Sequence, residues 1–550
     1  MTRIATVAIA CLSLLGPGCA GWMPRDSPVR IDADACARMP CVPAIEQDDA
    51  LQPARAWHRL ASRESGQRAQ AAWLRCAGLA HDVAARSVHP QAALALSTRC
   101  TRRLLSAWPA RRAITATPTE AGVDGLPLRI DLRDASPYLR APVRLHPASA
   151  PDMRHGEGFG VPVVLASARC DDAPVCDLLP PEGVFRDATA WIEPDDTGEG
   201  PHARLVVADP FVHATAQVGP HAVPLARDAT AAYGHAARRT KLPRLAIWGL
   251  LGGHEVGRRA GLYLLEDYDP DKQPLLMIHG LGSSPLAWRS ISDAVWSDPR
   301  LRARYQVWHL VYQTNAPLLV TRRRIHGYLD AAWRALDPEG DDPARSGMVV
   351  IGHSMGGVLA RLLCVDSGDA LWNAAFVLPP TRLRGSATDL AVVNDTFRFA
   401  PYPGIARAVF IAAPHRGSPN ATHGFGRLAR VLVGRRAMEM QSLRRIAIDN
   451  PDAVRPALLP IYRRAQLNSI STLQTTQPVR QAGESLMPAR GIPYHTIAGA
   501  LPGRQPPGDG VVPLDSALLD GAASTLVVAS GHDLYAHPQA VAEVMRILGQ

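Results

Sequence analysis

The fold is decided by the stretch VVIGHSMGGVLAR, residues 349–361. Its β-branched apolar start predicts a buried strand, and the apolar residues after Gly357 predict a helix. Between them lies a Gly-x-Ser-x-Gly motif formed by Gly352, Ser354 and Gly356. A sharp turn from strand to helix leaves no room for side chains at the two glycine positions and holds the serine exposed at the start of the helix. Ser354 is therefore the predicted nucleophile.

Outward from this motif, short apolar runs alternate with helical stretches from about residue 242 onward. Such alternation predicts a mostly parallel sheet with helices on both faces. In such sheets the active site forms where loops leave the carboxyl ends of the strands. The strand candidates are residues 261–265, 274–278, 305–311, 348–351, 408–412, 494–498 and 525–529.

A second motif is LMIHGLGSS, residues 276–284, which is followed by Trp288. Together with the GHSMG turn it resembles the α/β-hydrolase family, and within that family the bacterial lipases and esterases. The resemblance covers about residues 245–550 and implies an oxyanion hole formed by the backbone N–H groups of Leu281 and Met355. His279 is then expected to hold the loop in place rather than to react.

A serine hydroxyl needs a general base, and the base needs an orienting acid. The family order is serine, acid, histidine. The segment PGDGVVPLDS, residues 507–516, resembles the part that carries the acid in many lipases and offers Asp509, with Asp515 as the rival. The base is expected after the last strand, where His532 stands; its rival His537 precedes Pro538 and is typical of a helix start.

Residues of about 415–490 read as a helical insertion that begins with the lipase-like loop APHRGS, residues 413–418. Helices are expected at 425–433 and 443–448, and a second insertion at about 370–402 is expected to join them. Helices inserted over strand ends usually form a cap that shapes the acyl pocket and excludes water. A purely structural cap without gating motion is the equal alternative. Cys364 and Asp366 are expected to pack or be solvated.

The first half of the chain has a different texture. Residues 51–108 predict a helical hairpin, and the runs 126–130, 161–165, 188–192 and 203–208, separated by Gly, Pro and Asp clusters, predict a small antiparallel β domain. The predicted architecture is an α/β-hydrolase fold with an inserted helical cap, preceded by a helical hairpin and a small β-rich domain. The expected divisions are 1–18, 19–110, 111–240 and 241–550.

The N-terminus predicts export. Arg3 precedes an apolar run from Ile4 to Leu15 and then small residues, which together are typical of a secretory signal peptide over residues 1–18. Cys19 resembles the acylated cysteine of a bacterial lipoprotein, although Gly16 stands where leucine is usual. Lipidation would anchor the protein in the cell envelope, and simple cleavage would leave it periplasmic or secreted.

Cysteine usage agrees with an oxidising compartment. Cys11 lies in the signal, and six further cysteines come as close neighbours, for which local pairing is our prediction although other pairings stay possible. None of the cysteines has zinc-site spacing. The predicted pairs are Cys36 with Cys41, Cys76 with Cys100 and Cys170 with Cys176.

Charge and composition favour an ordinary globular protein, with 47% hydrophobic residues and a net charge of +9. The basic residues are spread along the chain, with Arg322–Arg324 as the longest run, so we expect no nucleic-acid partner. The resemblance implies hydrolysis of carboxylic esters, lipid or acyl esters above all, without metal or other cofactor. The alternatives are acyl transfer through the same acyl-enzyme, and an envelope scaffold with a decayed hydrolase; protein partners stay open.

Overall fold

The computed structural model describes residues 50–550 except 109–112, 115–118, 124–125, 134, 149–155, 196–201, 241–256 and 419–437. Among the described residues three helices come first: α2 (Gln52–Ala61), α3 (Gly66–Arg86) and α4 (Gln91–Ser106). A disulfide between Cys76 and Cys100 joins α3 to α4, as the local pairing predicted. The predicted signal peptide, Cys19 and the pair Cys36 and Cys41 lie outside the described residues.

The first sheet has seven strands in the order β1-β4-β5-β6-β7-β3-β2. Neighbouring strands are antiparallel except β3 and β7, which run parallel, so the predicted all-antiparallel arrangement is wrong at that pair. A separate hairpin of β8 (Thr215–Val218) and β9 (His221–Pro224) follows. The strands of the large sheet are β1 (Ala113–Ile114), β2 (Thr119–Val123), β3 (Leu126–Leu132), β4 (Val143–Pro147), β5 (Val161–Ser167), β6 (Val184–Asp195) and β7 (His202–Ala208).

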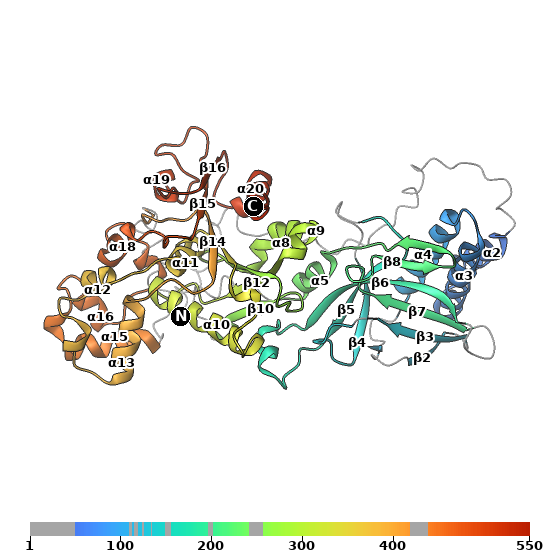
Figure 1. The fold of residues 1–550 in the computed structure, drawn as a ribbon, viewed down its shortest axis with the longest axis horizontal. Coiled ribbons are helices and arrows are strands. Elements are labelled where there is room, and N and C mark those ends of the chain that lie inside the picture. Colours follow the sequence, from blue (N-terminus) through green and yellow to red (C-terminus); the bar gives the residue numbers. More distant parts are fainter. Residues whose placement is uncertain are drawn as a thin grey trace, which may run out of the picture.

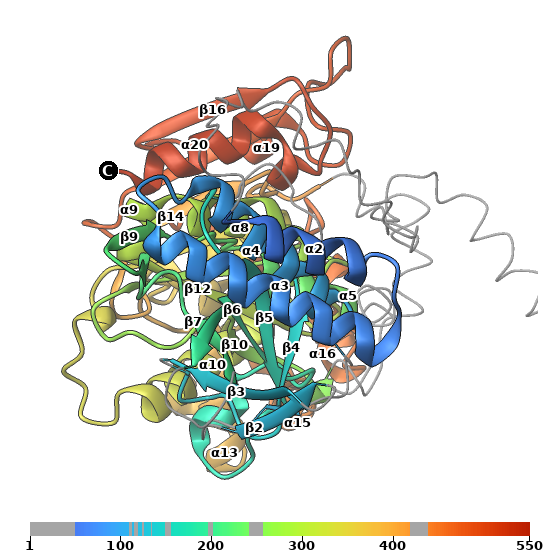
Figure 2. The ribbon, with the colours of Figure 1, turned by 90° about the vertical axis from the view of Figure 1, so that its right-hand side faces the viewer.

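The helices α2–α4 lie across one face of this sheet (Figure 2). Leu74 and Leu104 from the helices share one apolar cluster with Val163 and Ile192 from the strands. A helical hairpin alone can bury only one side of each helix, and a sheet needs a covering layer on its apolar face. The predicted division at residue 110 therefore separates two parts that share one core.

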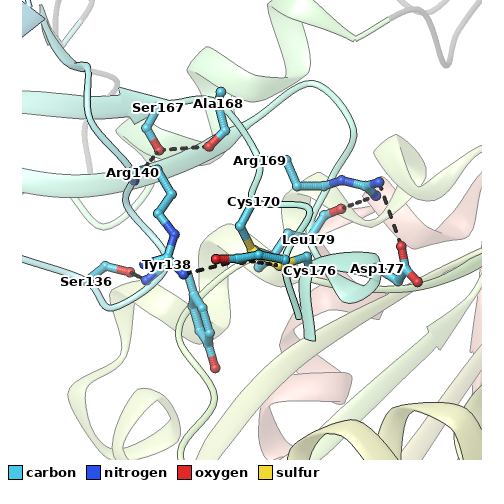
Figure 3. The surroundings of a disulfide bond; sticks show 11 residues. Ser136, Tyr138, Arg140, Ser167, Ala168, Arg169, Cys170, Cys176, Asp177 and Leu179 are labelled. Atoms are coloured by element: carbon cyan, nitrogen blue, oxygen red, sulfur yellow. Dashed lines mark hydrogen bonds and ion pairs between the residues drawn. A yellow bond between two sulfur atoms is a disulfide. The ribbon is translucent and has the colours of Figure 1, made fainter. Parts of the chain in front are cut away.

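A second disulfide, Cys170–Cys176, closes a short loop that ends in the 3₁₀ helix η2 (Pro174–Leu178) (Figure 3). This pairing too is the predicted local one. The loop carries Leu178 into the core of the second half of the chain. Close by, Asp267 of the second half accepts hydrogen bonds from Ser136 and Arg186, both at 2.7 Å. The two halves are thus held together by apolar and charged contacts.

The second sheet has the order β10-β12-β11-β13-β14-β15-β16. All neighbours are parallel except β10, which is antiparallel to β12. Each of the predicted strands of this half is present, with ends that differ by a few residues at most. Their bounds are β10 (Gly261–Leu264), β11 (Gln273–Ile278), β12 (Tyr305–Val311), β13 (Met348–His353), β14 (Ile405–Ile411), β15 (Tyr494–Gly499) and β16 (Ser524–Val528).

Helices cover both faces of this sheet because its central strands are apolar on both sides. Leu275 and Met277 of β11 face the layer of α8 (Arg289–Ser297), α9 (Pro299–Arg304) and α20 (Pro538–Leu548). Leu276 and Ile278, one residue out of step, face α10 (Leu318–Leu336) and α11 (Met355–Cys364). This alternation follows from the two-residue period of a strand.

The two predicted insertions form one helical body with its own apolar cluster, centred on Trp372, Phe376, Phe397, Ile446 and Tyr462. This body lies at the end of the molecule opposite to α2–α4 (Figure 1). The predicted helix at 443–448 falls within α15, whereas 425–433 lies outside the described residues. The described helices of the two insertions are α12 (Ala370–Ala375), α13 (Ala387–Phe397), α15 (Met438–Asp449), α16 (Leu459–Arg463), α17 (Ser469–Thr472) and α18 (Pro478–Ala482).

In the part of the chain that the structure describes, no helix combines the length and apolar character needed to cross a membrane.

Candidate active site

The turn between β13 and α11 holds Ser354 at φ 55° and ψ −126°, a backbone conformation that a residue with a side chain rarely adopts. The flanking glycines make this turn possible. A Cβ on Gly352 would lie 2.2 Å from the carbonyl oxygen of Gly356, and one on Gly356 would lie 2.0 Å from that of Ile278. Both distances are far inside van der Waals contact, so the motif needs glycine at both positions for steric reasons.

Ser354, His532 and Asp509 lie together although they come from three separate loops. Ser354 follows β13, Asp509 follows β15, and His532 follows β16. The Oγ of Ser354 is 2.9 Å from Nε2 of His532, and Nδ1 of His532 is 2.7 Å from Oδ2 of Asp509. Because β13, β14, β15 and β16 are parallel neighbours, their carboxyl ends meet at one edge of the sheet, where these loops begin.

Asp509 is buried, and its carboxylate is held by more than His532. Its Oδ1 accepts hydrogen bonds from the N–H groups of Val511 at 2.8 Å and Val512 at 2.7 Å. Burial by itself raises the pKa of Asp509, but the hydrogen bond from His532 and those two N–H groups outweigh it and hold that pKa below its ordinary value. The carboxyl therefore stays ionised beside the imidazole.

The rival residues occupy other places. Asp515 lies in the first turn of the short helix α19 (Leu514–Ala517). His537 is the N-cap residue immediately before α20, and its Nδ1 accepts a hydrogen bond from the Gln539 N–H at 3.3 Å. His537 thus caps a helix, in agreement with its position before Pro538, whereas Asp515 is a residue within a short helix.

The loop that carries Leu281 lies against the nucleophile. A Cβ on Gly280 would be 3.0 Å from the Cβ of Ser354. His279 holds this loop, because its ring stacks on Tyr312 at 4.5 Å and its Nδ1 is 3.0 Å from the carbonyl oxygen of Gly280. Burial lowers the pKa of His279 to about 4, so the ring is neutral at ordinary pH. Met355 directly follows Ser354 as the first residue of α11.

An apolar pocket, here called the chamber, lies between α10, α11 and the inserted helices. Val358 of its wall lies on α11, one helical turn after Ser354, the residue immediately before that helix. A chamber of this composition has the character of a site for an aliphatic group. The apolar lining residues include Leu318, Val320, Val358, Leu362, Phe397, Met440, Leu443, Tyr462, Val479 and Leu486.

Two buried histidines of this region received no role from the sequence. His353, inside the GHSMG motif, places Nε2 2.9 Å from the carbonyl oxygen of His532. His415 lines the chamber and is almost fully buried. A lone histidine in a sequence is more often structural than functional, and only the position of His353 beside Ser354 could have marked it.

Two groups of the described residues bring ligand-type atoms together, and neither lies at the triad. In the first, Cys170 and Cys176 are bonded to each other and flank Asp172. In the second, which also contains Asp341 and Asp342, the carboxylate of Asp337 is paired with Arg345. Both arrangements are explained by the contacts already present.

The part of the chain that carries this cluster matches a known protein family. Residues 275–544 match the family model described as "Alpha/beta hydrolase family". They form an α/β-hydrolase domain. The match spans both motifs, the inserted helices and all three residues of the Ser354–His532–Asp509 cluster, and it indicates a hydrolase. The helices α2–α4 and the first sheet precede this hydrolase domain.

Solved structures similar to the hydrolase domain differ in the reactions that their descriptions name. The mature form of lipase BlEst2 from Bacillus licheniformis is 15% identical, with a TM-score of 0.29, over 52% of this chain and 94% of its own. Lipase 1 from Pelosinus fermentans is 12% identical, with a TM-score of 0.30, over 51% and 98%. A structure described as one of novel epoxide hydrolases from metagenomes of hot environments is 16% identical, with a TM-score of 0.26, over 52% of this chain and 94% of its own. These values are too low to decide a reaction.

A comparison with curated proteins gave no match to the sequence.

Proposed function

We propose that the protein is a serine hydrolase that cleaves carboxylic esters through an acyl-enzyme. The observation that carries the proposal is the continuous chain of contacts from Ser354 Oγ through His532 to Asp509, at 2.9 Å and 2.7 Å. Nδ1–H of His532 donates to the Asp509 carboxylate, which leaves Nε2 free to accept the serine proton. This is the arrangement that turns a weak hydroxyl nucleophile into a reactive one.

In the proposed reaction, Ser354 Oγ attacks the ester carbonyl carbon while His532 takes the hydroxyl proton. The carbonyl oxygen becomes negative, and the N–H groups of Leu281 and Met355 donate to it. His532 then gives its proton to the leaving alkoxide, and an acyl-serine remains. Water, deprotonated by the same imidazole, releases the acid and restores Ser354. Asp509 orients the ring and stabilises the positive charge that forms on it.

We propose an aliphatic acyl ester, such as a lipid, as the substrate class. The chamber beside α11 supports this proposal because most of its lining residues are aliphatic or aromatic, although Arg361, Gln477 and Arg480 also border it. Each buried CH₂ group contributes roughly 0.8 kcal/mol, so a chamber that accepts a chain favours longer acyl groups. Replacing Val358 by tryptophan puts a larger side chain into the chamber, one helical turn along the chain from Ser354. We expect this variant to lose activity on decanoyl esters while keeping activity on acetyl esters.

Export to the cell envelope, with Cys19 as a lipid-bearing anchor, is also a proposal. The disulfides Cys76–Cys100 and Cys170–Cys176 support an oxidising destination. Metabolic labelling with radioactive palmitate tests the anchor: label should enter the native chain and be absent from Cys19→Ser. Equal labelling of both, or of neither, would remove the anchor from the proposal.

The reaction is tested on purified residues 20–550 with a fluorophosphonate probe and p-nitrophenyl esters. We expect peptide mass spectrometry to find the probe on Ser354, and turnover to be lost in Ser354→Ala and His532→Ala. The rivals supply matched controls, because Asp515→Asn and His537→Ala should retain activity. Full turnover in Ser354→Ala would contradict the proposal, and so would a folded native protein that neither reacts with the probe nor hydrolyses any ester. Product analysis in the presence of alcohols separates hydrolysis from acyl transfer.

A further inference from the structure

The histidine that precedes the nucleophile has a specific partner. His353 is the last residue of β13, and only 3% of its surface is exposed. Its Nε2 lies 2.9 Å from the main-chain carbonyl oxygen of His532. A carbonyl oxygen can only accept, so Nε2 of His353 carries a hydrogen and donates it. Because His353 and Ser354 are consecutive, this bond ties the proposed nucleophile directly to the loop that bears the proposed base.

The ring of His353 is fixed from two further sides. It stands edge-on to Tyr535, with ring centres 4.8 Å apart, and it lies 4.9 Å from the ring of His532 itself. Its other nitrogen, Nδ1, is buried without a hydrogen-bond partner among the described residues. On that side lies the oxyanion loop, since a Cβ on Gly280 would come within 3.2 Å of Nδ1. The ring thus fills the space between nucleophile, base and oxyanion loop.

Neutrality of this ring matters for the proposed chemistry. Burial, and after it the neighbouring His532, lower the pKa of His353 to about 3. When His532 takes the serine proton, a positive charge develops 4.9 Å away from the His353 ring. A neutral neighbour adds no repulsion to that charge, whereas a lysine or arginine at position 353 would oppose it.

The main-chain carbonyl oxygen of His532 accepts few other hydrogen bonds from the described residues. That oxygen also accepts the N–H of Leu534 at 2.8 Å, a bond within the same loop. Only the bond from His353 connects this oxygen to the strand that carries Ser354. Two contacts from outside the loop therefore hold His532 near Ser354: the bond from His353 to its main chain and the bond between its ring and Asp509.

We propose that His353 is a positioning residue for the reaction: its Nε2–H, donated to the His532 main chain, keeps the imidazole of His532 in line with Ser354 Oγ. This inference rests on the proposed Ser354–His532–Asp509 mechanism. Misplacing a catalytic group by about 1 Å costs on the order of 100-fold in rate. Loss of the donor should therefore lower kcat and the rate of fluorophosphonate labelling, while KM, which reports ester binding in the chamber, changes little.

The test compares His353→Met with His353→Gln in the full chain. Methionine fills a similar space without a donor, and glutamine offers an amide N–H in place of Nε2–H. We expect kcat to fall about 10- to 100-fold in His353→Met with KM within about twofold, and His353→Gln to recover most of the loss. The matched control is His309→Met, because His309 is equally buried in the same sheet and its Nε2 contacts Ser292, at 3.2 Å, rather than the triad.

The outcomes separate cleanly. Equal kcat in His353→Met and His353→Gln, or an equal loss in His309→Met, would overturn the positioning role. If His353→Met does not fold, His353→Phe replaces it, since phenylalanine keeps a ring against Tyr535 and lacks the donor. Full activity in His353→Met together with loss of activity in Ser354→Ala would contradict the positioning role of His353 and leave the proposed mechanism intact. An active Ser354→Ala sinks the underlying mechanism.

Discussion

Three buried histidines of the hydrolase domain should make its stability depend on pH. His279, His309 and His353 are each no more than 3% exposed. Burial lowers the pKa of His279 to about 4 and the pKa values of His309 and His353 to about 3. In the unfolded chain a histidine titrates near ~6.5. Below that pH the unfolded chain therefore binds protons that the folded protein does not bind, and the free energy of unfolding falls as the pH falls.

The magnitude follows from the same shifts. Each proton that only the unfolded state binds costs about 1.4 kcal/mol per pH unit, so each histidine loses about 2 kcal/mol of stabilisation between pH 7 and pH 5. Three such losses are comparable with the whole stability of many domains, about 5–15 kcal/mol. Asp187 and Glu266 act in the opposite direction, since burial raises the pKa of both carboxyls and folding then favours proton uptake.

Replacing one buried histidine separates its contribution to the pH dependence of stability from the contributions of the other histidines and the buried carboxyls. His309→Met should lose about 2 kcal/mol less stability between pH 7 and pH 5 than the native protein does. The assay is guanidinium unfolding followed by tryptophan fluorescence and circular dichroism at pH 7, 6 and 5. His89→Met, a change at an exposed histidine, controls for the substitution itself. If native protein and His309→Met lost equal stability over this range, the reasoning from burial would be refuted.

Three further changes have expected outcomes. Gly356→Ala should lower both the Tm and ester turnover, because a Cβ there would lie 2.0 Å from the Ile278 carbonyl oxygen; a variant with native Tm and activity would contradict the steric argument. Replacing Cys76 and Cys100 by serine should cost about 3 kcal/mol in guanidinium unfolding, since the bond closes a loop with a sequence separation of 24; an unchanged unfolding midpoint would refute it. Asp509→Asn should lower kcat about 1,000- to 10,000-fold with the fold intact by circular dichroism; a loss below tenfold would assign the acid elsewhere.

The strands of the hydrolase domain were predictable because each is a short, mainly apolar segment that alternates with helical stretches. Strand β12, buried along its whole length, has the predicted bounds Tyr305–Val311. Chain order then directed attention to Asp509 and His532, and the structure brings both to Ser354. The order of residues along the chain therefore carried more information about the candidate site than residue type alone.

The first sheet was harder to predict, for physical reasons. Strand β4 (Val143–Pro147) alternates only two buried residues with arginine and histidine. The parallel pairing of β3 with β7 joins segments far apart in sequence, and no local pattern encodes it. The core shared by α2–α4 and this sheet is equally non-local.

The role proposed for His353 could not be predicted from sequence either. Its hydrogen bond goes to a main-chain oxygen 179 residues away, and a main-chain acceptor leaves no mark in residue type. The inserted helices present the same difficulty, because two segments separated by β14 pack into one cluster around Phe376 and Tyr462. Sequence patterns indicate well which face of a helix or strand is buried. They indicate which distant elements are in contact only where a known motif links those elements.

The spacing of the triad along the chain has a consequence for protein synthesis. His532 comes 178 residues after Ser354, and its strand β16 forms the outer edge of the sheet. A growing chain that already contains Ser354 and the N–H groups of Leu281 and Met355 still lacks the proposed base, His532, and the proposed acid, Asp509. On the proposed mechanism, no nascent polypeptide can attack an ester until residue 532 has left the ribosome and β16 has paired with β15. If the protein acts on lipid esters as proposed, this order of synthesis keeps it inactive toward the lipids of the cell that makes it during most of its own translation.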